Sequence, residues 1–231
     1  MSRLTTLGQL KYESRLRADK VGSGFIKDDE LLTYINSSYA ELYDLLVGAY
    51  GNDYYAKEYA FATVGQQRAY PLPADFYKLL GADYVVGPTS ILTLKPYQFN
   101  ERNRYQQGAY WSALVGIYGP KYRITEENID FAPIPDGSYN IVLHYVPACP
   151  KLADDVDTAN GVNGWEEYII VDCAIKMLQK EESDVSVLMA QKQALLGRIN
   201  LMAENRDAGQ SFRVTDVTSS WLDDDGDTYR F

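Results

Sequence analysis

The side chain best suited to acid–base chemistry near neutral pH is His144, the only histidine in the 231-residue chain. It stands within residues 141–146, an apolar, strand-like stretch. A catalytic triad would also need a nucleophile beside it, and the sequence offers no nucleophile–base arrangement. The pattern favours a strand histidine whose ring bonds to a neighbour. A hydrolase that uses His144 is therefore the last of three hypotheses.

Paired carboxylates could also carry out acid–base work, and they occur as Asp154 with Asp155 and as Glu166 with Glu167. Both pairs lie in a loop or at the start of a helical pattern. Acids are favoured there because they complement the positive end of the helix dipole. We expect these carboxylates to serve the fold.

Two glycine-containing motifs resemble ligand loops. DDDGD at 223–227 is similar to a calcium loop, but Gly226 comes too early for an EF-hand and the chain ends before a Glu at position twelve. The Gly22-x-Gly24 pair precedes a helical pattern but follows no strand, so a phosphate cradle is weakly supported. We interpret DDDGD as a solvated acidic cluster.

The cysteines and the histidine lack metal-ligand spacing. Cys149 and Cys173 lie far apart, in an apolar strand pattern and an apolar helix pattern. We expect core thiols rather than a disulfide, which fits an intracellular origin. The chain is expected to bind no metal or cofactor and not to be an enzyme.

A formal net charge of −10 argues against a protein that grips nucleic acid by its phosphates. No apolar run reaches the length of a membrane span, and the first residues show no apolar signal segment. The 20 tyrosines suit surfaces that are partly apolar and partly wet, as protein interfaces often are.

Helical patterns occupy both ends of the chain. A short apolar stripe opens at Leu4, and a stronger one holds one face for about five turns from Leu31 to Ala49, with Asp28 or Asp29 as its cap. Residues 165–180 are apolar on nearly every side, except for a wet strip formed by Asp172 and Lys176, whose spacing suits an ion pair. A third stripe, capped by Ser183 or Asp184, comprises Val185, Leu188, Met189, Leu195, Leu196, Ile199 and Met202.

Between these helical patterns, the spacing of apolar residues changes to one typical of strands. Residues 54–150 are rich in β-formers and turn signals, and indicate about six short strands in a small antiparallel sheet or partial barrel. The clearest hairpin runs from 121 to 134 around a turn at 126–128. Residues 97–112, which include Tyr105, Tyr110 and Trp111, are interpreted as a loop or short helix that presents side chains outward.

The predicted fold class is α+β: a helical bundle body with an inserted small antiparallel β module and an extended C-terminal arm. The expected domains are N-terminal helices at 1–53, the β module at 54–150, a C-terminal helix hairpin at 151–206 and the arm at 207–231. The residues expected to pack the core or the contacts between subunits are Ile35, Tyr39, Leu42, Trp165, Ile169, Cys173 and Met177.

The last 25 residues are polar and acidic with spaced apolar residues, and cannot form a core of their own. Aromatic residues at wide spacing favour an arm that docks on another chain over a floppy tail. The expected anchors are Phe212, Val214, Val217, Trp221, Leu222, Tyr229 and Phe231.

Four features in this order carry a resemblance: a short N-terminal helix, INSSYAELYDLL at 35–46, YPLPADFYKLLGADY at 70–84, and a C-terminal helix hairpin with a tail. The chain resembles the head–tail adaptor (connector) proteins of tailed bacteriophages, particularly those of short-tailed phages. The resemblance covers most of the chain, and its two sequence stretches are not strict signatures.

The resemblance implies a structural virion protein that is made in the host cytoplasm and sits at the head–tail interface. Twelve copies would form a ring beneath the portal protein, with helices around the DNA channel and the β module facing outward or toward the tail (nozzle) protein. The arm would climb onto portal subunits, and genomic DNA would pass through during ejection without specific binding. No membrane is implied.

A second hypothesis, from a different class, is a tail-associated carbohydrate- or receptor-binding module. In that case Tyr105, Tyr110 and Trp111 would stack on sugars, as aromatic side chains do on flat apolar faces.

Overall fold

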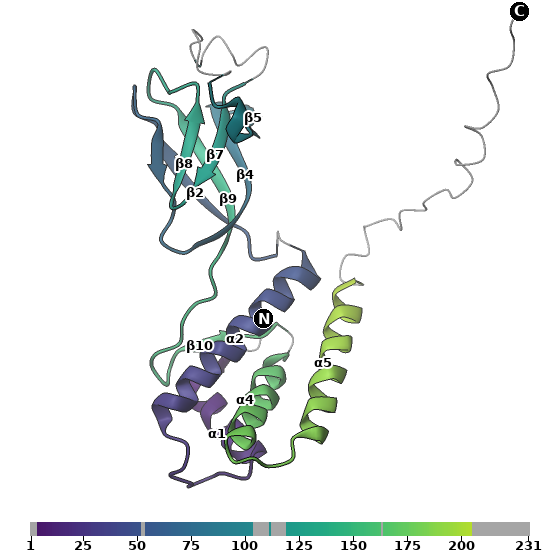
Figure 1. Ribbon diagram of the computed structural model, residues 1–231. Coiled ribbons are helices and arrows are strands. Elements are labelled where there is room, and N and C mark those ends of the chain that lie inside the picture. The colour runs from purple at the N-terminus through teal and green to yellow at the C-terminus, as the bar shows by residue number, and fades with distance from the viewer. Residues whose placement is uncertain (1–3, 52–53, 104–110, 112–118, 163, 205–231) are drawn as a thin grey trace, which may run out of the picture.

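The computed structural model describes residues 4–51, 54–103, 111, 119–162 and 164–204. These residues form two parts, a β module and a helical part, which lie at opposite ends of an elongated molecule (Figure 1). The chain enters the β module after the second helix and returns to the helical part after the strand that ends at Pro147.

The helical part contains four helices and a two-stranded ribbon among the described residues. The helices are α1 (Leu7–Arg17), α2 (Asp28–Tyr50), α4 (Glu166–Lys180) and α5 (Ser186–Glu204). The ribbon pairs β1 (Leu4–Thr6) with β10 (Thr158–Asn160) in antiparallel register.

Helix α2 confirms the long apolar stripe, since Leu31, Ile35, Tyr39 and Leu42 all lie in one buried cluster. Its cap differs from the prediction. Lys27 occupies the N-cap and makes no side-chain cap bond, while three acids, Asp28 among them, fill the first turn, where they complement the helix dipole.

Helix α4 is the centre of the helical part, and it packs against α1, α2 and α5. Ten of its fifteen residues are buried, as its nearly all-round apolar sequence predicts. The expected wet strip is wrong for Asp172, which is only 4% exposed, because α5 covers it.

The expected helical bundle body is wrong. The fold is α+β, with helix at 38% and strand at 28% in three sheets, and one of these sheets, β1–β10, lies within the helical part. The ribbon forms where the residues just before α1 pair with β10. Thr6 ends β1 and also caps α1, since its side chain accepts the backbone N–H of Gln9. A strand of three residues is too short to show an alternation of apolar and polar residues. The sequence around the ribbon therefore showed only helical patterns, which predicted a bundle.

The β module consists of two four-stranded sheets, of order β2-β9-β4-β5 and β3-β8-β7-β6. All their pairings are antiparallel except β6–β7. The elements are β2 (Lys57–Ala62), β3 (Ala69–Pro71), β4 (Phe76–Gly87), β5 (Ser90–Thr93), β6 (Lys95–Pro96), the 3-10 turn η1 (Phe99–Glu101), β7 (Lys121–Thr125), β8 (Asn128–Ala132) and β9 (Asn140–Pro147).

The predicted hairpin is confirmed as β7–β8, with a tighter turn than expected. Asn128 already belongs to β8, and the residue with positive φ is Glu126, at 53°. A separate aromatic core fills the module, where Trp111, Phe131, Tyr70 and Tyr84 are buried.

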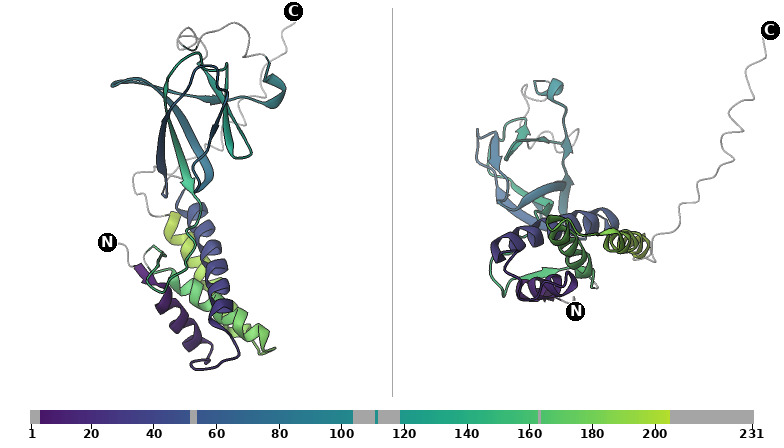
Figure 2. Two further views of the ribbon diagram at one scale, coloured as in Figure 1. Left: turned by 90° about the vertical axis from the view of Figure 1, so that its left-hand side faces the viewer. Right: turned by 60° about the horizontal axis from the view of Figure 1, so that its bottom comes forward.

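A small cluster joins the two parts. Tyr43 and Val47 of α2 meet Val146 of β9, and the Tyr43 hydroxyl donates to the Pro147 carbonyl oxygen at 2.7 Å. The turned views show the β module standing beyond the end of α2 (Figure 2).

Candidate functional site

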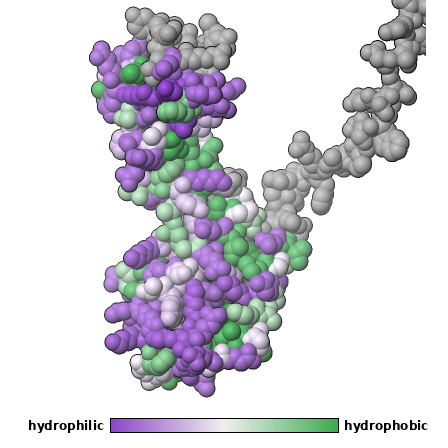
Figure 3. Space-filling view, viewed as in Figure 1, coloured by the Kyte–Doolittle hydropathy of each residue, from purple (hydrophilic) through white to green (hydrophobic). Residues whose placement is uncertain are grey.

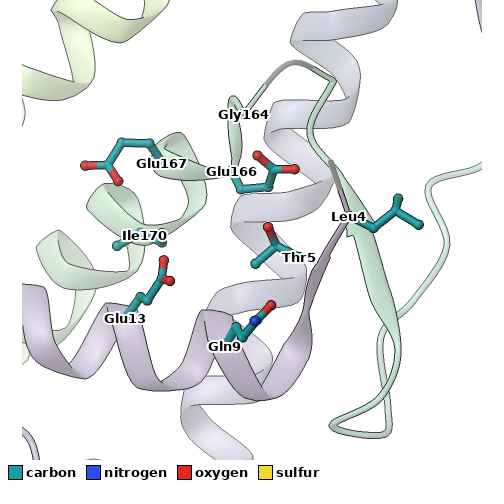
Figure 4. Close-up of a pocket in the computed structure, with 8 residues that line it drawn as sticks. All are labelled: Leu4, Thr5, Gln9, Glu13, Gly164, Glu166, Glu167 and Ile170. Atoms are coloured by element: carbon teal, nitrogen blue, oxygen red, sulfur yellow. The ribbon is translucent and has the colours of Figure 1, made fainter. Parts of the chain in front are cut away.

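A polar pocket lies between α1, the ribbon and the start of α4 (Figure 4). Its volume is about 210 Å³. Figure 4 shows acidic and amide side chains of α1 and α4 around a common space. The lining residues are Leu4, Thr5, Gln9, Glu13, Gly164, Glu166, Glu167 and Ile170.

The pocket carboxylates mostly hold the fold. Glu166 is buried and accepts the backbone N–H of Gly161 at 3.1 Å. A Cβ on Gly161 would come within 2.6 Å of the Glu166 carboxyl carbon, so glycine is required for this close approach. Glu167 pairs with Arg17 of α1. The interpretation of the 166–167 pair as structural is consistent with these contacts.

An ionic network centred on the buried Asp172 ties three helices together. Asp172 of α4 accepts the Ser38 hydroxyl at 2.6 Å and the ammonium groups of Lys176 and Lys192, each at 2.8 Å. Lys192 of α5 also reaches Glu41 of α2, at 2.9 Å. The predicted Asp172–Lys176 ion pair is confirmed, and the link to α5 was not foreseen.

The network shifts the pKa of both central groups. Burial alone would raise the pKa of Asp172, but hydrogen bonds from Lys176, Lys192 and Ser38 outweigh it and hold that pKa below its usual value. Burial alone would lower the pKa of Lys192, yet its bonds to Asp172 and Glu41 raise it. Both groups are therefore charged at neutral pH.

His144 lies on the outer face of the first sheet, between two carboxylates. Its Nε2 is 3.1 Å from Asp83 of β4, and its Nδ1 is 3.7 Å from Glu58 of β2. This confirms the prediction of a strand histidine satisfied by a neighbour. Both ring nitrogens face acids, so neither is directed at a nucleophile in this arrangement.

Trp111 does not present its ring to solvent. It is fully buried, its Nε1 donates to the Pro133 carbonyl oxygen at 2.7 Å, and its ring stacks on Tyr139 at 5.0 Å between centroids. The expectation that it points outward is wrong, and it cannot stack on a sugar from this position. Tyr105 and Tyr110 lie outside the described residues.

The seven expected packing residues all lie in one buried cluster of the single chain. Their burial therefore comes from the chain's own helices, and contacts with another copy would have to use other side chains. These residues are Ile35, Tyr39, Leu42, Trp165, Ile169, Cys173 and Met177.

The predicted arm, with its anchors from Phe212 to Phe231, lies outside the described residues. The acidic cluster at 223–227 lies outside them as well.

Both cysteines are free thiols. Cys173 is buried, and burial raises its pKa to about 11; Cys149 is half-buried, and burial raises its pKa to about 12. The thiols are therefore protonated at neutral pH. No group of three or more potential metal ligands occurs among the described residues.

Sequence reasoning did not foresee two exposed apolar faces. Helix α1 exposes Tyr12 and Leu16, and α5 exposes Val187 and Leu201. In the space-filling view, apolar residues gather over the side of the helical part where α5 lies (Figure 3). Exposed apolar surface on a helix is a candidate for an interaction site.

None of the helices in the described part of the chain is both long enough and apolar enough to cross a membrane. The family model described as SU10 adaptor protein matches residues 5–217. A search of curated proteins found no match.

Proposed function

The chain belongs to the SU10 adaptor protein family of bacteriophage adaptor proteins, and from this membership we propose that it forms a ring that joins the portal protein to the tail. A phage structural adaptor is a component of the virion and interacts with other phage structural proteins. Family membership by itself does not specify four features that we propose here: the portal protein and the tail protein as partners, the ring of twelve copies, and the DNA channel.

The observation that carries the proposal is the extent of the family match. Residues 5–217 include the ribbon apart from Leu4, all the described helices and the whole β module. Both parts of the fold therefore belong to the adaptor unit, and neither is an addition to it. An elongated chain with two separate cores can contact different neighbours at its two ends (Figure 2).

Charge supports a passive channel for DNA. With a formal net charge of −10, the surface repels phosphates, so DNA would slide past without binding. We assign the DNA no specific contact, only passage during ejection.

We also propose that the protein is not an enzyme. The groups that could do chemistry are engaged in the fold: Glu166 with Gly161, Asp172 with two lysines, and His144 with Asp83. Their contacts are those of structural groups, and they support a protein that acts by assembly.

The test is assembly with the portal. The purified chain is mixed with the portal protein of the same phage and imaged by negative-stain electron microscopy, which should show added ring density below the portal. A chain that ends at residue 206 should bind at least tenfold more weakly, since the arm anchors are removed. If the full chain never adds density to the portal, the proposed function is wrong.

A further inference from the structure

Helix α5 is apolar on two opposite faces. Its inner face packs Leu195 and Ile199 into the core. At 100° per residue, a second stripe of apolar or small residues lies on the opposite side. All five residues of this outer stripe are exposed: Val187, Ala190, Ala194, Gly197 and Leu201.

The outer stripe carries no charge. The only charged residues between 187 and 201 are Lys192, which bonds to Asp172 and Glu41, and Arg198, whose guanidinium lies 5.5 Å from the centroid of the Trp165 ring. A helix with apolar residues on two faces normally has both faces covered. Among the described residues, contacts with α2 and α4 cover the inner face of α5.

Nothing in the described part of the chain requires a glycine at position 197. A Cβ at this position would meet nothing within 4 Å, and its backbone does not have positive φ. A glycine inside a helix costs about 1 kcal/mol relative to alanine. Beside Ala190 and Ala194, it leaves a shallow surface about 11 Å long, onto which another helix can pack closely.

The described chain carries a face of complementary shape on α1. Tyr12 and Leu16, which are 59% and 57% exposed, project one turn apart, about 6 Å along the axis, on the side opposite the buried Leu7 and Leu10. Two large side chains at this spacing fit a stripe of small residues, as knobs fit into holes.

The two faces cannot meet within one chain. They belong to two helices that both pack against α4 (Figure 2, right). Each face lies opposite the buried residues of its own helix. When one surface of a protein fits a different surface of the same protein, copies associate head to tail, and the contact closes into a ring if the rotation allows it.

We propose that the outer face of α5, Val187 to Leu201, receives Tyr12 and Leu16 of α1 from the neighbouring copy. This inference rests on the proposed function, because it names the contact between subunits of the ring. It commits to a second copy of this chain as the occupant.

The test is a disulfide between copies. In a Cys149→Ser background, one batch carries Tyr12→Cys with one affinity tag, and a second carries Ala194→Cys with another tag. Both positions are exposed, so the fold is retained. The two batches are mixed, assembled on the portal, oxidised and separated on a non-reducing gel.

We expect a linked dimer that carries both tags, at least tenfold more abundant than with a control pair in which Ile91→Cys replaces Tyr12→Cys. Ile91 is equally exposed but lies in the β module. A ring that forms without this preference overturns the inference and leaves the proposed function standing. A link from Ala194→Cys to the portal also overturns it, and absence of any ring overturns both.

A second variant tests the close approach. Gly197→Leu should reduce ring assembly at least tenfold while the circular dichroism spectrum stays unchanged, because leucine fills the surface that Tyr12 needs. Gly48→Leu is the matched control: Gly48 also lies in a helix with nothing within 4 Å of its Cβ. Equal assembly by the two variants would contradict the inference.

Discussion

Asp172→Asn should weaken the attachment of α5 more than any change at an exposed acid. The substitution keeps the size of the side chain but replaces one oxygen with an NH₂ group, which can only donate. One of the two ammonium groups, Lys176 or Lys192, would then face a donor in place of an acceptor.

The expected loss is about 3 kcal/mol in the free energy of unfolding. Removing one partner of a buried ion pair costs roughly 3–5 kcal/mol, because the other charge stays buried without compensation. The lower end applies here, since the side chains of Lys176 and Lys192 are 26% and 20% exposed and can turn partly toward water. Position 172 itself is buried and cannot turn toward water.

The assay is urea unfolding followed by circular dichroism at 222 nm, which reports on the helices. The shift of the midpoint multiplied by the slope gives the change in free energy. Glu182→Gln is the control, because it removes the same charge at an exposed position just before α5 and should change stability by less than about 0.5 kcal/mol. Hydrogen exchange should show that α5 loses protection before α2.

Coupling is tested with Lys192→Met. If the network acts as described, the double variant Asp172→Asn with Lys192→Met should be more stable than the sum of the single losses predicts, by about 1 kcal/mol or more. A loss at Asp172→Asn no larger than at Glu182→Gln, or strictly additive losses, would refute the reasoning that this buried charge pair holds α5.

Three further changes test the same structure. Because the pKa of Asp172 is lowered in the folded state, its contribution to stability should disappear as pH falls below about 4. Because the pKa of Lys192 is raised in the folded state, its contribution should disappear as pH rises above about 10.4. Urea-unfolding midpoints measured across pH check both. Trp111→Ala should cost about 3–5 kcal/mol of stability, measured by urea unfolding, and reduce the near-ultraviolet circular dichroism of the β module, because the ring fills its core. Gly197→Ala should stabilise the unassembled chain by up to about 1 kcal/mol, measured by urea unfolding, since nothing obstructs the new methyl group.

The long-period features of the fold could be predicted from the sequence. The stripe from Leu31 to Ala49 runs over about five turns, and residues 165–180 are apolar on nearly every side, so both helices were located correctly. The β7–β8 hairpin was also located, because β-formers flank a polar turn.

Features that depend on residues far apart in the chain could not be predicted. The β1–β10 ribbon joins three residues near the start to three residues near 159, which is too short for any period. Trp111 lies at the end of the polar and aromatic stretch 97–112, yet residues of both sheets pack around it. Met189 and Met202, assigned to the buried stripe of α5, are both largely exposed, because apolar residues cover two faces of that helix and periodicity cannot rank them.

The same features make α5 suited to docking. Its two basic side chains, Lys192 and Arg198, are engaged by groups of its own chain, so covering the outer stripe would remove no unpaired charge from water. The free energy needed to remove a charge from water is the main reason why buried ion pairs often fail to stabilise a contact. The outer stripe of α5 is uncharged, and the basic side chains of the helix already have partners in their own chain. Such a face can bind a neighbour by apolar contact alone. The network around Asp172 holds α5 in place with its uncharged face outward, and in the proposed ring it would therefore serve assembly as well as folding.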